Sequence, residues 1–135
     1  MVESCGLVIK HKNEILLIKP KGISGKNFSI PKGLMENGED YMDAAIRETY
    51  EEVGLKFEKK NIILSSYNTI PYINNKVVTK KLHYFLVDVS SSNKEDVLSS
   101  LKLQNSEVAS ANFYTKEEAI NLIFWRQAII LHYFL

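Results

Sequence analysis

The chain has 135 residues, of which 45% are hydrophobic and 24% are charged, as in an ordinary water-soluble globular protein. Seventeen basic residues against 16 acidic ones leave a net charge of +1, so no overall field favours nucleic acid or an acidic surface as a partner. The length predicts a single domain over residues 1–135, large enough to bury a hydrophobic core without disulfides.

The first elements are predicted to be strands. Residues 3–10 and 14–19 are apolar and rich in β-branched side chains, and the polar segment 11–13 between them predicts a hairpin. Residues 22–26 are expected to form a loop. A short strand is predicted at 28–30, where it stops before a proline.

A helix is predicted between Asp40 and Gly54, because an aspartate favours a helix start and a glycine favours its end. Two further strands are predicted at 61–67 and 76–89. The segment that separates them contains Pro71 and ends in a pair of asparagines, so we expect a loop there.

The last third of the chain predicts a polar loop at 90–93 and a strand at 108–114. Thr115 with Glu118 three residues later is a capping-box signature, which opens a C-terminal helix or helix pair packed on the core. The order of strands, helix, strands and helix predicts an α+β fold in which helices pack against a mixed sheet.

The single cysteine and the N-terminal and C-terminal segments predict the cellular compartment. A single cysteine, Cys5, cannot form an internal disulfide, which fits a reducing compartment. The N-terminal residues do not resemble a signal peptide, and polar residues such as Arg126 interrupt the apolar C-terminal stretch, which falls short of a membrane span. We therefore expect a cytoplasmic protein without a membrane partner.

Three glutamates crowd the central helix. At 100° per residue, Glu48, Glu51 and Glu52 lie within roughly a 100° arc beside an apolar packing face. The packing face is predicted to contain Met42, Ala45, Ile46, Thr49 and Val53. Like charges at this spacing repel, and a divalent hard cation is a natural way to neutralise them, although glutamate clusters are also common on solvated helix faces.

The register of this segment separates these two interpretations. Gly33 is followed after five residues by Glu39, and after seven more by R-E-T-Y-E-E-V-G-L, which begins at Arg47. This pattern resembles the Nudix box at every fixed position and covers residues 33–55. The chain is therefore identified by resemblance as a member of the Nudix hydrolase family.

The resemblance implies an α/β/α sandwich and hydrolysis of nucleoside diphosphates linked to a further moiety, with Mg²⁺ or Mn²⁺ as cofactor. By position, Glu48, Glu51 and Glu52 would bind the metal, and a backbone carbonyl at Gly33 or the preceding residue could add a ligand. Arg47 and Glu39 would support the helix and loop. A glutamate of the box, or a carboxylate outside it, would take a proton from the attacking water.

Weaker features concern the substrate, which would be a small nucleotide. The segment S-I-P-K-G resembles the approach to the box in asymmetrical diadenosine tetraphosphate hydrolases, with Phe28 where tryptophan is usual. By this resemblance Lys32 would contact phosphates, Tyr84 would line or stack on an adenine, and Glu107 would be an extra catalytic carboxylate. A solvated lysine, a core tyrosine and a surface glutamate remain the alternatives for these three residues.

The predicted reaction is cleavage of diadenosine tetraphosphate to ATP and AMP. Alternative substrates are a nucleoside triphosphate, ADP-ribose and a triphosphorylated RNA end. A Nudix-like binding module without catalysis is the alternative outside the enzymes, and its mark would be a substituted glutamate in the box. All the glutamates of the box are present in this chain.

Overall fold

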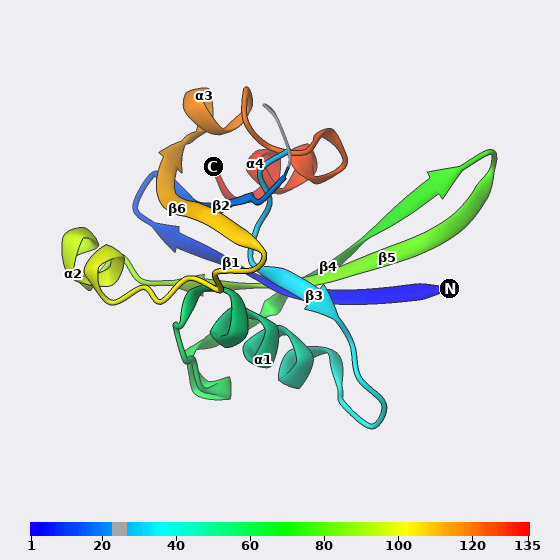
Figure 1. Ribbon diagram of the computed structural model, residues 1–135, viewed down its shortest axis with the longest axis horizontal. Coiled ribbons are helices and arrows are strands. Elements are labelled where there is room, and N and C mark those ends of the chain that lie inside the picture. The colour runs from blue at the N-terminus through cyan, green and yellow to red at the C-terminus, as the bar shows by residue number, and fades with distance from the viewer. Residues whose placement is uncertain (23–26) are drawn as a thin grey trace.

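A mixed sheet of six strands organises residues 1–22 and 27–135, which are the residues that the computed structural model describes (Figure 1). The strands are β1 (Val2–His11), β2 (Glu14–Pro20), β3 (Lys32–Leu34), β4 (Ile62–Asn74), β5 (Val77–Asp88) and β6 (Val108–Thr115). Their order is β4-β5-β1-β2-β6, with β3 also paired to β1. Because β2 pairs only with the last residues of β1, β3 occupies the place beside its first half.

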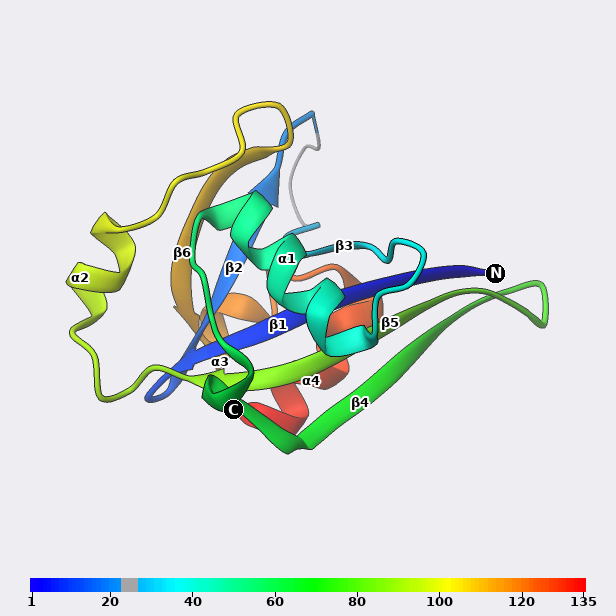
Figure 2. The same cartoon turned by 90° about the horizontal axis from the view of Figure 1, so that it is seen from below.

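Helices cover both faces of this sheet, which confirms the predicted α+β sandwich. They are α1 (Tyr41–Val53), α2 (Lys94–Ser99), α3 (Lys116–Ala119) and α4 (Ala128–Phe134). Figure 1 shows α1 below the sheet and α3 and α4 above it, and Figure 2 shows α1 in front of β1 with α4 behind. Within the described residues, no helix is both long enough and apolar enough to cross a membrane.

The core consists of two clusters, one on each face, and the strands alternate between them. In β1, Leu7 and Ile9 pack toward α1, whereas Val8 packs toward α4. In β2, Leu16 packs toward α1 and Leu17 toward α4. Since both faces are covered, these strands read as continuous apolar runs in the sequence.

Two predictions around the first proline and the second hairpin need correction. Residues 28 and 29 form only isolated bridges, and the continuous strand is β3, which follows Pro31. The expected loop around Pro71 is part of β4, which runs on to Asn74. β4 is the edge strand of the sheet, where a proline loses no ladder hydrogen bond when its nitrogen faces outward.

The remaining elements follow the predictions with small differences. The turn between β4 and β5 lies at Asn75 and Lys76, which both have positive φ. The 90–93 loop and the capping box of Thr115 and Glu118 are confirmed, but helix α2 after the loop was not predicted. The predicted loop at 22–26 lies, for residues 23–26, outside the described residues.

Candidate active site

Local signals place both ends of α1. The side chain of Asp40 accepts a hydrogen bond from the backbone N–H of Asp43 at 2.7 Å, which caps the first turn. Gly54 has φ 78° and donates its N–H to the carbonyl of Tyr50, so the helix ends in a left-handed residue. Both boundaries agree with the sequence prediction.

The two predicted faces of α1 are present. Ala45, Thr49 and Val53 are fully buried, while Met42 and Ile46 are partly buried against the same cluster. The carboxylate face turns toward β3, and its members differ in exposure. Glu51 is exposed, whereas Glu52 is only 7% exposed. The helix therefore places the ionisable side chain of Glu52 at the edge of the hydrophobic core.

The strand β3 lies directly against two of the glutamates. A Cβ atom on Gly33 would lie 2.0 Å from Oε2 of Glu48, so a larger residue there would displace that carboxylate from its present position. The missing side chain of Gly33 thus allows this close approach, whereas Gly38, with φ 85°, allows a turn in the loop before α1. The backbone N–H of Lys32 donates to Oε1 of Glu52 at 2.9 Å.

Arg47 holds the acidic side chains of the loop and the helix together. Its guanidinium donates to both carboxylate oxygens of Glu39, at 2.7 and 2.9 Å, and to Glu48 at 2.9 Å. It also contacts Glu51 at 3.1 Å and the carbonyl of Leu34 at 2.9 Å. The hydrogen bonds from Arg47 lower the pKa of Glu39, and they raise the pKa of Arg47 itself.

Burial raises the pKa of two carboxyl groups on α1. The pKa of Glu52 is raised to about 7, mainly by burial, with Glu48 and Glu107 adding like charge. Burial also raises the pKa of Glu48, against the opposing effect of Arg47. Glu52 is therefore close to its titration point at neutral pH when no cation is bound.

This pKa predicts that the metal-free protein loses stability as the pH rises. A carboxyl group with a raised folded-state pKa stabilises the fold fully below its unfolded pKa, 4.5, and this contribution is lost as the pH passes about 7. For Glu52 the loss is on the order of 3 kcal/mol. Urea unfolding in EDTA between pH 5 and 8 measures it, with Glu52→Gln as the comparison. An equal loss of stability in the variant would contradict the assignment.

The glutamates share a pocket of about 400 Å³ with basic and polar side chains from other elements. Glu107, from the loop before β6, and Lys32, from β3, also line this carboxylate pocket. Lys80 of β5, Gln104 and Ser4 of β1 line it as well. Positive and negative groups therefore face the same space, which suits an anionic ligand bound through cations.

A second pocket of about 300 Å³ adjoins the first, because Lys32 and Lys80 line both. Its other lining residues include Tyr72 of β4 and Phe124, whose rings lie 6.0 Å apart at an angle of 60°. Gln127 lines it too, and its amide is fixed by the backbone N–H of Ile30 and by the hydroxyl of Ser29. This aromatic pocket offers ring contacts to a flat apolar group.

Two predicted substrate residues lie elsewhere. Tyr84 is 1% exposed and packs edge-on against Phe134 in the α4-side cluster, so the structure does not bring its ring into either pocket. Phe28 is also in this cluster, and its backbone carbonyl accepts a hydrogen bond from the N–H of Phe124. Phe28 is thus hydrogen-bonded through its backbone to a residue of the aromatic pocket but does not line the pocket itself.

The donor set of the carboxylate pocket fits a hard divalent cation. Carboxylates of Glu48, Glu51 and Glu52 line it together with the backbone of Gly33, and oxygen is the donor that Mg²⁺ and Mn²⁺ prefer. As they lie, however, these carboxylates do not converge, and the described residues contain no preformed group of three or more ligating side chains. Arg47 holds Glu48 and Glu51, and the amide of Lys32 holds Glu52.

Sequence reasoning missed Tyr72, Lys80, Gln104, Phe124 and Ser4 as lining residues. None of these residues belongs to the Nudix box, but strand pairing brings several of them close to it. Tyr72 lies opposite Lys80 across β4 and β5, and Lys80 lies opposite Val2 across β5 and β1. The sequence signal for these residues was weak, since it consisted of a basic residue within a predicted strand of alternating polar and apolar residues.

Comparison with known proteins gives a consistent picture. The family model described as NUDIX domain matches residues 2–134. The chain is 34% identical over 109 residues to the asymmetrical bis(5'-nucleosyl)-tetraphosphatase of Caenorhabditis elegans, a match that covers 78% of this chain and 76% of that protein. It is 41% identical over 51 residues to the m7GpppN-mRNA hydrolase dcap-2 of the same organism, but this match spans only 38% of this chain and 6% of that protein.

Among solved structures, the chain is similar to a binary complex of the C. elegans Ap4A hydrolase. The TM-score is 0.78, the identity is 26%, and the match covers 99% of this chain and 95% of that one.

Proposed function

The chain belongs to the NUDIX family, and we propose from this that it hydrolyses a phosphoanhydride bond of a dinucleoside polyphosphate, with diadenosine tetraphosphate as substrate and Mg²⁺ or Mn²⁺ as cofactor. The observation that carries the proposal is the adjacency of the carboxylate pocket and the aromatic pocket through Lys32 and Lys80. One pocket suits a polyphosphate and its metal, and the other suits a base.

Glu48, Glu51, Glu52 and the carbonyl of Gly33 would hold the metal. When bound, the metal neutralises phosphate oxygens and acidifies a coordinated water. The Lys32 amide contacts Oε1 of Glu52 and Arg47 contacts Oε1 of Glu48, so the second oxygen of each carboxylate would ligate the metal. Arg47 then acts by keeping the loop, which it binds through Glu39 and Leu34, in place against the helix.

The basic and aromatic residues bind the substrate. The ammonium groups of Lys32 and Lys80 lie between the two pockets and neutralise the polyphosphate. Tyr72 and Phe124 pack on the adenine, and Gln127, whose amide is held by Ile30 and Ser29, supports the wall of the same pocket. Glu51 and Glu107 both line the carboxylate pocket, and either can take the proton of the attacking water.

The similarity to the C. elegans tetraphosphatase supports this choice of substrate, since it extends over most of both chains.

A product assay tests the proposal. Incubation with diadenosine tetraphosphate and Mg²⁺ is expected to yield ATP and AMP in equal amounts, measured by ion-exchange chromatography, and EDTA is expected to abolish the reaction. Two molecules of ADP would contradict the predicted cleavage site. Turnover of a nucleoside triphosphate, ADP-ribose or a triphosphorylated RNA in its place would reassign the substrate, and turnover of none of these would favour a binding module.

A further inference from the structure

Ser4 carries a hydroxyl group whose burial the fold does not explain. Its side chain is 1% exposed, and its Oγ has no hydrogen-bond partner within the described part of the chain. A buried polar group without a partner costs stability. Thr49 is the other described residue with such a group, but it lies on the packing face of α1, whereas Ser4 lines the carboxylate pocket.

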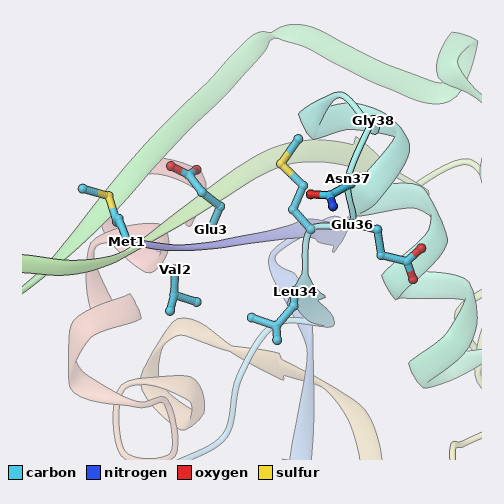
Figure 3. Close-up of a pocket in the computed structure, with 8 residues that line it drawn as sticks. Met1, Val2, Glu3, Leu34, Glu36, Asn37 and Gly38 are labelled. Atoms are coloured by element: carbon cyan, nitrogen blue, oxygen red, sulfur yellow. The ribbon is translucent and has the colours of Figure 1, made fainter.

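Strand register fixes the direction of the Ser4 side chain. Ser4 lies two residues after Val2 on β1 and opposite Leu34 on β3, so all three side chains lie on the same face of the sheet. Figure 3 shows Val2 and Leu34 on one side of β1 and Glu3 on the other. Ser4 therefore points away from Glu3 and toward the face that carries the lysines.

The two lysines of the pocket bracket Ser4 along β1. Lys80 lies opposite Val2, and Lys32 lies opposite Gly6, so Ser4 occupies the position between them on the same face. Lys32 and Lys80 line the same two pockets, and burial together with the nearby Lys32 lowers the pKa of Lys80 to about 8. Two lysine side chains and a hydroxyl group without a hydrogen-bond partner, all at one place, form a site that suits an anion.

We propose that the hydroxyl of Ser4 donates a hydrogen bond to a phosphate oxygen of the substrate, between the phosphates held by Lys32 and Lys80. This inference rests on the proposed function, because the polyphosphate is its substrate. Ser4 is then a substrate-binding residue that gains its partner only when the pocket is filled. The uncomplexed protein retains the cost of burying the hydroxyl, and binding removes it.

The experiment compares Ser4→Ala with the matched variant Thr49→Val, which also removes a buried unpartnered hydroxyl. Ser4→Ala is expected to raise the midpoint of thermal unfolding by roughly 3 to 5 °C. It is also expected to weaken the binding of inorganic tripolyphosphate, measured calorimetrically in EDTA, by roughly 10-fold or more, since a hydrogen bond to a charged group is lost. Thr49→Val is expected to leave this binding unchanged.

Kinetics give a second measurement. Ser4→Ala is expected to raise KM for diadenosine tetraphosphate with little change in kcat, because the hydrogen bond is made in the ground state and the transition state alike. Weakened binding together with unchanged or raised stability supports the proposal, and every other combination overturns it. Should the wild-type protein hydrolyse no phosphoanhydride yet bind tripolyphosphate through Ser4, the proposed function fails, and Ser4 keeps its role in binding phosphate but not a substrate.

Discussion

Replacing Glu52 with glutamine is expected to lower kcat by roughly a thousandfold or more while the protein stays folded. Glutamine has nearly the same volume, and its amide oxygen can still accept the hydrogen bond that the Lys32 N–H gives to Oε1 of Glu52. It cannot supply a carboxylate to a cation, and losing a charged group at the reacting centre costs several powers of ten. Steady-state kinetics with diadenosine tetraphosphate and saturating Mg²⁺ measure the change.

A measurement of stability distinguishes a loss of catalysis from a loss of folding. At pH 8 in EDTA, Glu52→Gln is expected to be at least as stable as the wild-type protein, because the neutral amide avoids burying a charge. Glu117→Gln, at an exposed position on α3, is the matched control and should keep full activity. A Glu52→Gln variant with wild-type turnover would show that the cation binds elsewhere.

The parts of the site that the sequence predicted are those specified by short-range signals. Asp40, Gly54 and the spacing of the apolar residues determine where α1 starts, where it ends and which face it buries. Glu48, Glu51 and Glu52 follow from that helix geometry without knowledge of the rest of the fold. The box resemblance also assigned the Gly33 carbonyl to the same metal site, whereas the close approach of Gly33 to Glu48 is seen only in the structure.

The parts that the sequence did not predict depend on strand pairing. Tyr72 and Tyr84 are both aromatic residues on strands, but Tyr72 lies beside a pocket and Tyr84 lies under α4. Nothing within either segment distinguishes them, because α4, more than forty residues later, decides which position is covered. In the same way Pro71 predicts a loop unless its strand is known to be an edge.

Replacing Arg47 with alanine is expected to destabilise the protein by roughly 2 to 4 kcal/mol and to lower activity by at least roughly a hundredfold. The side chains of Glu39 and Glu48 are only 17% and 14% exposed, and both would lose their ionic partner. A charge left unpaired at a partly buried site costs much more than the pair itself contributes. Urea unfolding and steady-state kinetics measure the two effects.

Arg47→Lys tests whether charge alone is sufficient. A lysine keeps the positive charge but lacks the planar fork with which Arg47 binds Glu39 through two nitrogens and also reaches Glu48 and Leu34. We expect it to restore part of the stability and little of the activity. Lys59→Ala is the control, since its ion pairs with Asp40 and Asp43 are exposed and screened by solvent, so its loss should change stability little. If Arg47→Ala behaved like Lys59→Ala, the loop and helix would be held by packing, and Arg47 would have no positioning role.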